Sequence, residues 1–268
     1  MSNLKIYCVT NKRLDLLESY SYKFGWVGKD KVPENYIRCD DKENIFFKEK
    51  YYSELTFHYW YWKNALNLND SNWVGFCQKR RYWVKKESEK INLNKNNFKN
   101  HLLDAAPDEW SQYDSIICNP VNVNKVKKIK MLKRGFRTII KKPEIFFNEK
   151  KQSLRFHFDM HHGYGNLDKA INLIDEKDKK EFFEYVNNSV SYNPHIMFIA
   201  KSETLDKWFN VVFSWLQRCE SEFGFDNLKG YDTQRLYAYL AERYLSFWFN
   251  KYTKVLNWPW SFFDPNEK

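Results

Sequence analysis

The sequence is poor in the residues that break regular structure. It has only eight glycines and seven prolines among 268 residues, which excludes collagen-like and low-complexity chains. No stretch approaches the roughly 18 consecutive apolar residues of a membrane-spanning helix. Charges at Lys5, Lys12 and Arg13 also interrupt any signal-type apolar stretch near the beginning. We therefore expect a folded protein that does not cross a membrane.

Cysteines and common catalytic motifs are also sparse. The five cysteines are scattered, odd in number and form no Cys-x-x-Cys pair, so we expect reduced core residues in a cytosolic protein. No Walker loop, Rossmann nucleotide-binding fingerprint or Gly-x-Ser-x-Gly elbow occurs. No Asp-x-Asp motif follows a predicted strand. The sequence thus lacks the usual motif for manganese or magnesium, and we expect no required metal or other cofactor.

Aromatic residues and positive charge are abundant instead. The chain has 22 Phe, 18 Tyr and 11 Trp, which excludes an intrinsically disordered protein. A net charge of +10 suits an anionic partner such as a nucleic acid, a phosphate-bearing ligand or an acidic membrane surface. A soluble surface with surplus lysine explains the same charge.

Short apolar runs alternate with amphipathic helical patterns. The predicted strands are Lys5–Thr10, Trp73–Cys77, Tyr113–Cys118 and His195–Ala200. The predicted helices are Tyr51–Leu66, a segment from Leu167 toward Asn187, Leu205–Phe223 and a last helix from Asp232. The pattern is typical of an α/β fold with a mainly parallel sheet flanked by helices. We expect a single domain over residues 1–268, with a basic segment at 125–142 and an aromatic and basic tail at 247–268.

Polar clusters directly follow three predicted strands. They are Thr10-Asn11-Lys12, Gln78-Lys79-Arg80-Arg81 and Asn119. Because ligands of such folds bind beyond the carboxyl ends of strands, we expect these clusters around one crevice. Guanidinium groups can hold phosphate oxygens bidentately, and a diphosphate leaving group needs such a counter-charge. A solvated surface cluster is the alternative.

The segment 125–142 holds nine basic residues and no acidic one, and its apolar residues fit no single period. A solvated, mobile arm is the first interpretation. The alternative is a basic arm over a phosphate-rich acceptor or an anionic bilayer.

Titratable residues cluster in two further places. Arg243 lies on the apolar face of the last helix, where it pairs with a carboxylate such as Glu54 or contacts a ligand. At the start of that helix, beside Arg235, capping is a sufficient role for Asp232. The group of His157, Asp159, His161 and His162 suits metal binding, hydrogen bonds to a substrate, or local structure.

Several blocks of sequence are recognisable together. In chain order they are Lys5–Lys12, Tyr52–Thr56, Tyr59–Asn64, Gly75–Tyr82, His161-His162, Met197–Ile199, Gln234-Arg235 and Leu240–Arg243. In order and spacing the chain resembles a family first described as a domain of unknown function and found in bacterial capsule and O-antigen loci. Its members are described as glycosyltransferases, and some transfer galactofuranose.

The resemblance implies a glycosyltransferase-A-type, Rossmann-like α/β fold that binds a nucleotide sugar. The implied reaction transfers galactofuranose, galactose or an N-acetyl derivative from a UDP-sugar to a growing capsular or lipopolysaccharide glycan, with inversion. The strand end that carries Asp-x-Asp in related folds here carries Gln78-Lys79-Arg80-Arg81. We therefore expect cations to replace the metal.

The resemblance also implies roles for individual residues. The donor would be bound by Thr10, Asn11, Lys12, Gln78, Arg80 and Arg81. Asp232 is the first candidate for the general base and Asp159 the second. The sugar or acceptor would contact Glu54, His161, His162, His195, Arg235 and Arg243.

The sequence departs from the family pattern at three places. Gln78-Lys79 stands where the family usually has His-Tyr, and Asn11 stands where it usually has His. Asn193–Met197 replaces a Cys-Asn-Met block. Because these positions are expected to line the sugar site, the donor is expected to differ from that of better-known relatives.

The implied acceptor is an oligosaccharide or is lipid-linked, so we expect a cytoplasmic protein that is peripheral on the inner face of the membrane. In the tail, Phe247–Phe249 and Trp258–Phe263 suit either an interfacial foot or core packing. Two rival functions are a non-catalytic carbohydrate-binding or assembly protein and a nucleic-acid-binding module. No recognised RNA-binding motif supports the latter, and we expect no nucleic acid partner.

Overall fold

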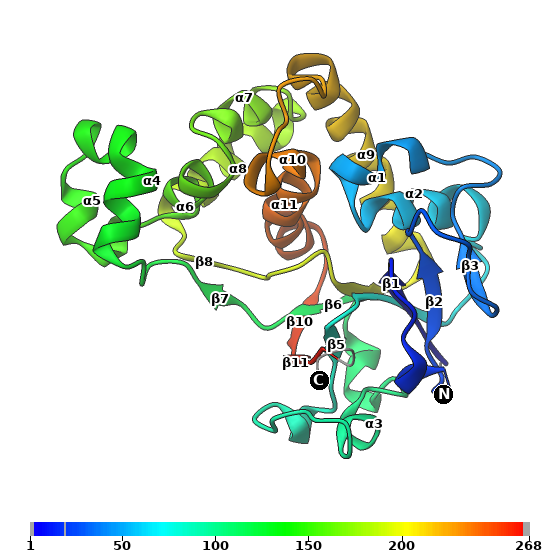
Figure 1. Ribbon diagram of the computed structural model, residues 1–268. Helices are drawn as coiled ribbons and strands as arrows, with labels where there is room; N and C mark the ends of the chain where they lie inside the picture. The colour runs from blue at the N-terminus through cyan, green and yellow to red at the C-terminus, as the bar shows by residue number, and fades with distance from the viewer. Residues whose placement is uncertain (1–2, 19, 265–268) are drawn as a thin grey trace. The chain divides into compact units, whose positions relative to one another are not determined.

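The computed structural model describes residues 3–18 and 20–264, so the last four residues of the predicted tail, 265–268, lie outside the described residues. The chain forms two compact units, whose elements Figure 1 labels. Unit 1 is built from residues 1–119, 195–210 and 249–268. Unit 2 is built from residues 120–194 and 211–248.

A mixed, mainly parallel sheet forms the centre of unit 1. Its strands are β1 (Leu4–Thr10), β2 (Lys23–Trp26), β3 (Tyr36–Arg38), β4 (Trp73–Gln78), β5 (Arg81–Trp83), β6 (Ser115–Cys118), β9 (Phe198–Ala200), β10 (Val255–Trp258) and β11 (Trp260–Phe262). The main path runs β10-β6-β9-β4-β1-β2-β3, and β5 pairs with β4 and β11. The adjacent strands β4, β1, β2 and β3 are parallel to one another, and β10 is parallel to β6. The strand β9 is antiparallel to both of its neighbours, β4 and β6. The predicted fold class is confirmed.

Helices and short 3-10 turns flank this sheet. They are η1 (Asp15–Leu17), η2 (Phe46–Lys48), α1 (Glu49–Tyr52), α2 (Leu55–Asn64), η3 (Lys86–Ser88), α3 (Phe98–His101) and η4 (Asp108–Gln112). Alternating strand residues supply two apolar faces. On one face, Tyr7 of β1 packs its ring 5.8 Å from that of Phe57 in α2. On the other, Trp110 contacts both Trp73 and Trp258, with ring centroids 5.5 and 5.1 Å away.

Unit 2 is mainly helical. Its helices are α4 (Lys128–Lys141), α5 (Glu144–Phe147), η5 (Glu149–Lys151), α6 (Leu154–His162), α7 (Asn166–Asn172), α8 (Glu176–Asn188) and α10 (Tyr231–Gln234). The boundary between the units falls inside α9 (Ser202–Phe223) and α11 (Leu236–Tyr252). A two-stranded ribbon, β7 (Val121–Asn122) with β8 (Ser191–Tyr192), completes the unit. Buried polar groups tie its helices together: Tyr244 donates to the Asp178 carboxylate over 2.8 Å.

Two predicted helices are interrupted. The helix expected over 51–66 breaks at Ser53, whose φ of 52° lies in a region that few non-glycine residues adopt. The helix expected from Leu167 toward Asn187 is divided into α7 and α8 by residues 173–175. Both predictions were wrong in length because the apolar spacing continues across each break.

Most residues of the basic segment 125–142 are exposed, which agrees with the solvated part of the first interpretation. Residues 128–141 form the regular helix α4, which packs against α6 (Figure 1). Met131 and Gly135 are buried in this contact. At 100° per residue its apolar residues form one broad arc that runs from Met131 and Gly135 through Ile139 to Phe136 and Ile140, so the expectation that they fit no helical period was wrong.

Most aromatic residues of the predicted tail belong to the core. Phe247, Trp248, Phe249 and Trp258 are all buried. Their burial favours core packing over an interfacial foot. Tyr252 and Phe262 are exposed, and Trp260 and Phe263 are half-buried. The five cysteines are buried and form no disulfide with one another. No helix in the described residues is long and apolar enough to span a membrane.

Candidate functional site

In unit 1 the candidate donor-binding residues gather at the carboxyl ends of β1 and β4. These strands are parallel, and Val9 pairs with Gln78 in the last step of their register. Beyond it, the main-chain N–H of Lys79 donates to the carbonyl of Val9 over 3.1 Å. The Lys79 ammonium also donates to the side-chain oxygen of Asn11. The two polar clusters predicted after these strands are therefore brought together.

A side-chain turn fixes the loop after β1. The buried Thr10 hydroxyl donates to the carbonyl of Lys12 over 2.6 Å and accepts from the N–H of Lys12 over 3.0 Å. This reciprocal pair holds the chain in a tight turn. Asn11 and Lys12 are exposed at its tip, where they are available to a ligand.

The turn between β4 and β5 presents two arginines. Gln78, at the end of β4, is buried and pairs with Arg81 at the start of β5. Arg80, at the corner, has φ 73°, a left-handed conformation that costs a non-glycine residue energy. Its carbonyl accepts from the N–H of Phe263 over 3.0 Å, and its guanidinium lies 3.7 Å from the carboxylate of Asp264. Two residues that directly follow β11 therefore hold the strained corner in place.

Arg81 is positioned by a residue from a distant part of the chain. Its Nε donates to Nε2 of His195 over 3.0 Å. An accepting Nε2 requires a neutral imidazole with its proton on Nδ1. His195 itself has φ 64°, and its ring stands edge-on to Trp260 with centroids 4.5 Å apart. Predicted donor and sugar residues therefore meet at this contact.

Two other predicted residues of unit 1 have different surroundings. Asn119 donates to the carboxylate of Glu89 over 2.6 Å. Glu54 is half-buried and precedes α2, where its carbonyl accepts from the N–H groups of Phe57 and His58.

In unit 2 the helix α6 carries the predicted histidines and Asp159. Ser153 caps its start by accepting from the N–H of Phe156 over 3.4 Å. Because residues four apart share one face of a helix, His157 and His161 have ring centroids only 4.7 Å apart. Burial lowers the pKa of His161 to about 4 and that of His162 to about 3, with nearby cations adding to the effect. Both imidazoles are neutral at pH 7 and able to donate and accept hydrogen bonds.

Asp232 lies in a network with two of these histidines. Arg134 of α4 lies 3.0 Å from the Asp232 carboxylate and donates to Nδ1 of His161 over 3.2 Å. Nδ1 of His162 donates to the main-chain carbonyl of Asp232 over 2.9 Å, and its ring stacks on Tyr239 at 3.7 Å. The N-cap of α10 is Gly230, so the capping role expected for Asp232 was wrong.

Arg243 is buried, as its place on the apolar helix face indicated. Its carboxylate partner is the adjacent Glu242 at 2.6 Å, so the suggested pairing with Glu54 was wrong. It also donates to Nδ1 of His157 over 3.3 Å and lies over the ring of Tyr192 at 3.9 Å. Arg235 is half-buried at the end of α10, 5.7 Å from the ring of Tyr231.

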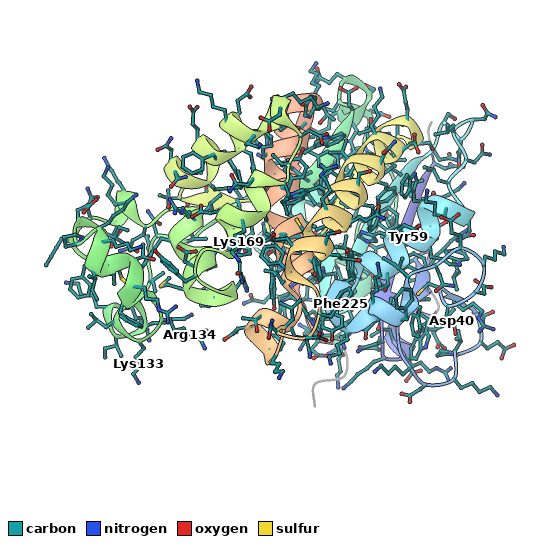
Figure 2. All side chains as sticks on the ribbon, turned by 90° about the horizontal axis from the view of Figure 1, so that it is seen from above. Asp40, Tyr59, Lys133, Arg134, Lys169 and Phe225 are labelled. Carbon is teal, nitrogen blue, oxygen red and sulfur yellow. The ribbon has the colours of Figure 1, made fainter. Side chains whose placement is uncertain are left out.

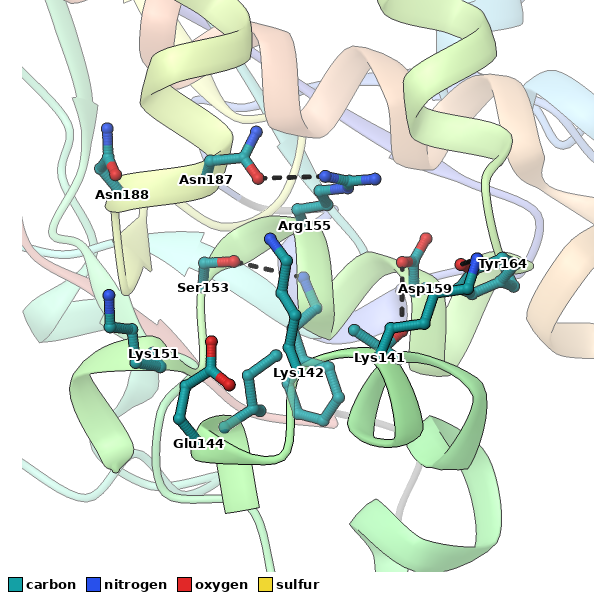
Figure 3. Close-up of a pocket in the computed structure, with 13 residues that line it drawn as sticks. Lys141, Lys142, Glu144, Lys151, Ser153, Arg155, Asp159, Tyr164, Asn187 and Asn188 are labelled. Carbon is teal, nitrogen blue, oxygen red and sulfur yellow. Dashed lines mark hydrogen bonds between the residues drawn. The ribbon is translucent and has the colours of Figure 1, made fainter. Parts of the chain in front are cut away.

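Asp159 lines a cavity of about 220 Å³ (Figure 3). Gly165 donates its N–H to one carboxylate oxygen over 3.0 Å, and the hydroxyl of Thr138 lies 3.5 Å from the other. Burial raises the pKa of Asp159 to about 6, against the lowering effect of these hydrogen bonds. A carboxylate with this pKa can accept a proton near neutral pH.

Basic side chains dominate the rest of this cavity. Four of them line it: Lys141, Lys142, Lys151 and Arg155. In Figure 3, Arg155 is hydrogen-bonded to Asn187, and Lys141 is hydrogen-bonded to Tyr164 near Asp159. Arg155 also pairs with Asp168. The cavity combines one carboxylate of raised pKa with cations suited to an anionic or polyhydroxyl ligand.

A second, more open hollow of about 330 Å³ lies at the beginning of α4. It is lined by Asn122, Val123, Lys125, Val126, Lys127, Lys130, His157 and His161.

Within the described residues, no three His, Cys, Asp or Glu side chains are grouped so that they could hold a metal ion. The metal-binding interpretation of the α6 histidines therefore finds no ligand set there.

Sequence reasoning missed several residues that shape these sites. Each of these residues contacts a predicted residue or lines a cavity with one. They are Arg134 beside His161, Tyr239 on His162, and Lys141 and Arg155 in the Asp159 cavity. The density of cations around 125–142 was the one available signal for Arg134 and Lys141. Their partners come from other segments: His161 of α6 and Asp232 of α10 contact Arg134, and Tyr164 in the turn after α6 contacts Lys141.

Across 97% of its length the chain is similar to the apo structure of WbbM, a bifunctional glycosyltransferase, with a TM-score of 0.71 and 18% identity. The chain spans 45% of that protein. It therefore shares the fold of part of a glycosyltransferase.

Residues 5–254 match the family model described as a domain of unknown function, DUF4422. The chain belongs to this family. No curated protein matches the chain.

Proposed function

We propose that the protein is a glycosyltransferase that uses a nucleotide-sugar donor. The observation that carries the proposal is the cluster of Lys79, Arg80 and Arg81 at the carboxyl ends of β1 and β4. Ligands of open α/β sheets bind at this edge, and the same fold occurs in a glycosyltransferase.

The cation cluster suits a donor diphosphate. Arg80 and Arg81 would hold the phosphate oxygens and stabilise the charge that develops as the glycosyl bond breaks. The turn at Thr10, Asn11 and Lys12 would contact the nucleotide, which we propose to be UDP. Since cations occupy the strand end, we propose that phosphate neutralisation needs no metal.

We propose that a carboxylate acts as the proton acceptor. Inverting transfer needs a base that takes the proton of the acceptor hydroxyl. Asp159 lines a cavity and has a pKa of about 6, whereas Asp232 is half-exposed and paired with Arg134. This geometry favours Asp159 as the base and Asp232 as a positioning residue for His161 and His162.

The acceptor and the transferred sugar follow from the family resemblance. We propose a galactofuranose-type, galactose or N-acetyl sugar and a capsular or lipopolysaccharide acceptor, either an oligosaccharide or a lipid-linked one. The lysines around the Asp159 cavity are compatible with a phosphate-bearing acceptor. Such an acceptor would be met in the cytoplasm at the inner face of the membrane.

A donor screen tests the proposal. UDP-sugars are added to the purified chain, and the unfolding temperature and the release of UDP are measured with and without EDTA. We expect a UDP-sugar to raise the unfolding temperature by mass action, with EDTA leaving the shift and turnover intact. Failure of every nucleotide sugar to stabilise the chain or to react would overturn the proposal. Loss of turnover on chelation, restored by manganese, would contradict the metal-independent step alone.

A glycan-binding assay separates the enzyme from its nearest rival. A non-catalytic carbohydrate-binding protein would bind glycans without consuming any donor. Arg38→Lys is a matched control for arginine substitutions in unit 1. Arg38 is an exposed residue at the end of β3 and pairs with Asp40. Its donor response should equal that of the unchanged protein.

A further inference from the structure

Four apolar side chains of the helix α4 are exposed in the described structure. The exposed fractions are 70% for Ile129, 54% for Leu132, 49% for Phe136 and 75% for Ile140. They are spaced three, four and four residues apart, so they lie on one face of the helix. We refer to these four residues as the α4 apolar face.

The α4 apolar face adjoins the side that holds the helix in place, with the partly buried Ile139 between them. Met131 and Gly135 form the buried side, against Phe156 and Met160 of α6. A Cβ added at Gly135 would lie 2.8 Å from the ring of Phe156, so glycine permits the close packing of the two helices. The helix is thus anchored on unit 2 by one side while its apolar face remains uncovered.

Positive charge borders the α4 apolar face. At 100° per residue, Lys130, Lys133 and Arg137 fall in the sector next to it. Figure 2 shows Lys133 projecting away from the helix. The whole segment 125–142 contains nine basic residues and no acidic one. An exposed apolar stripe beside a purely cationic stripe is typical of helices that lie in a membrane interface.

We propose that α4 docks on an anionic lipid bilayer, with the α4 apolar face inserted among the acyl chains and the neighbouring cations on lipid phosphates. Charge complementarity favours this occupant, because the cations attract acidic lipids while no acidic side chain of the segment opposes them. A helix of 14 residues can lie in the interface but is too short to span the hydrocarbon core. The proposal does not rest on the donor chemistry.

Vesicle flotation with the full chain tests the proposal. The probes are vesicles of phosphatidylcholine alone and of phosphatidylcholine with phosphatidylglycerol, at low and high salt. We expect binding to the anionic vesicles only, weakened by salt because surface charges are screened. Absence of binding to phosphatidylglycerol vesicles at low salt would overturn the proposal.

Two sets of variants assign the binding to α4. Leu132→Ser with Phe136→Ser should reduce the fraction bound about tenfold or more, and Ile129→Ser with Ile140→Ser should act similarly from the ends of the helix. Lys130→Gln with Lys133→Gln should weaken binding and flatten its salt dependence. The control is Phe47→Ser, which removes an apolar side chain that is 78% exposed in unit 1 and should leave binding unchanged.

Three further results would contradict the docking of α4 on a bilayer. If the two apolar double variants, shown to be folded by their unfolding temperatures, bind vesicles as well as the unchanged protein, the proposal is wrong. If light scattering instead finds a dimer that Phe136→Ser dissociates, with no vesicle binding, the α4 apolar face joins two copies of the chain. Salt-dependent binding to RNA with no vesicle binding would likewise replace the lipid with a nucleic acid.

Discussion

Nε of Arg81 and Nε2 of His195 are joined by a 3.0 Å hydrogen bond across 114 residues of sequence. The backbone of His195 has a left-handed φ of 64°, and Arg81 is the first residue of β5. The contact fixes the direction of one guanidinium at the carboxyl edge of the sheet. A pre-positioned guanidinium loses little entropy when an anion binds, which makes this pair the sharpest test of the donor site.

Arg81→Lys should weaken UDP binding about tenfold, or ~1.4 kcal/mol. Lysine retains the positive charge but lacks both the Nε donor to His195 and the planar fork that matches phosphate. Calorimetric titration with UDP measures the effect, and Arg38→Lys is the matched control.

His195→Ala should produce a similar loss, because the imidazole holds the arginine in place. If the two residues act as one unit, the double variant should be little worse than either single one. Independent, additive losses would show that the hydrogen bond does not position Arg81 for the donor.

Asp159→Asn should lower turnover by about two orders of magnitude or more, the usual contribution of a general base. Since the pKa of Asp159 is about 6, the rate of the unchanged protein should rise as pH increases through 6 and then level off. Asp232→Asn should have a smaller effect, because it loses an ion pair with Arg134 at a half-exposed position. Steady-state rates across pH 5 to about 8 measure both. Near-normal turnover in Asp159→Asn together with an inactive Asp232→Asn would reverse the two roles.

His162→Gln should make the protein less sensitive to acid. Burial lowers the folded-state pKa of His162 to about 3, whereas an unfolded histidine titrates near 6.5. The unfolded state therefore binds more protons between these values, and the free energy of unfolding falls as pH drops below about 6.5. Glutamine cannot take up that proton, so the loss of unfolding temperature from about pH 7 to pH 5 should shrink.

The control for that experiment is Tyr239→Phe, which keeps an aromatic ring stacked on His162 and leaves the imidazole in place. Its acid sensitivity should match that of the unchanged protein. His157 and His161 have lowered pKa values from the same burial, so part of the acid sensitivity should survive in His162→Gln. An unchanged pH dependence in His162→Gln would show that the histidine is not buried as a neutral group.

Gly25→Ala should destabilise unit 1 by about 1–3 kcal/mol, the usual cost of overpacking a core. The added Cβ would lie 2.5 Å from the ring of Phe57, which is fully buried between α2 and the sheet. Denaturant unfolding measures the loss. Phe57→Leu introduced into Gly25→Ala should recover part of it, because the smaller side chain makes room; purely additive losses would contradict the predicted clash.

The sequence was sufficient for four of the nine strands described in the sheet, β1, β4, β6 and β9, and for one edge of the candidate site. Short apolar runs such as Trp73–Cys77 are typical of buried strands and can be recognised without knowledge of their neighbours. Because β1 and β4 are parallel, the polar residues that follow these two strands lie at the same edge of the sheet. Asn11 and Lys79 do meet there.

Other features depend on contacts that no local pattern encodes. The break at Ser53 interrupts a run whose helical spacing is intact on both sides. The apolar residues of α4 form one broad arc, of which one part packs on α6 and the other is exposed, and the sequence pattern does not show where burial stops. The ion pair of Arg134 with Asp232 joins helices that are far apart in the chain, and nothing near either residue predicts the other.

The order of the strands has a consequence for synthesis of the protein. The outermost strand β10 pairs with β6, and β11 pairs with β5, although each pair joins residues near 255–262 to residues 81–118. During translation the ribosome must therefore complete all of unit 2 before it supplies these last strands of unit 1. Until then β6 presents an open edge, a state in which nascent chains are prone to mispairing. Unit 1 is expected to finish folding only after the chain emerges past Phe262, so chaperones that shield exposed strands should matter most in that interval.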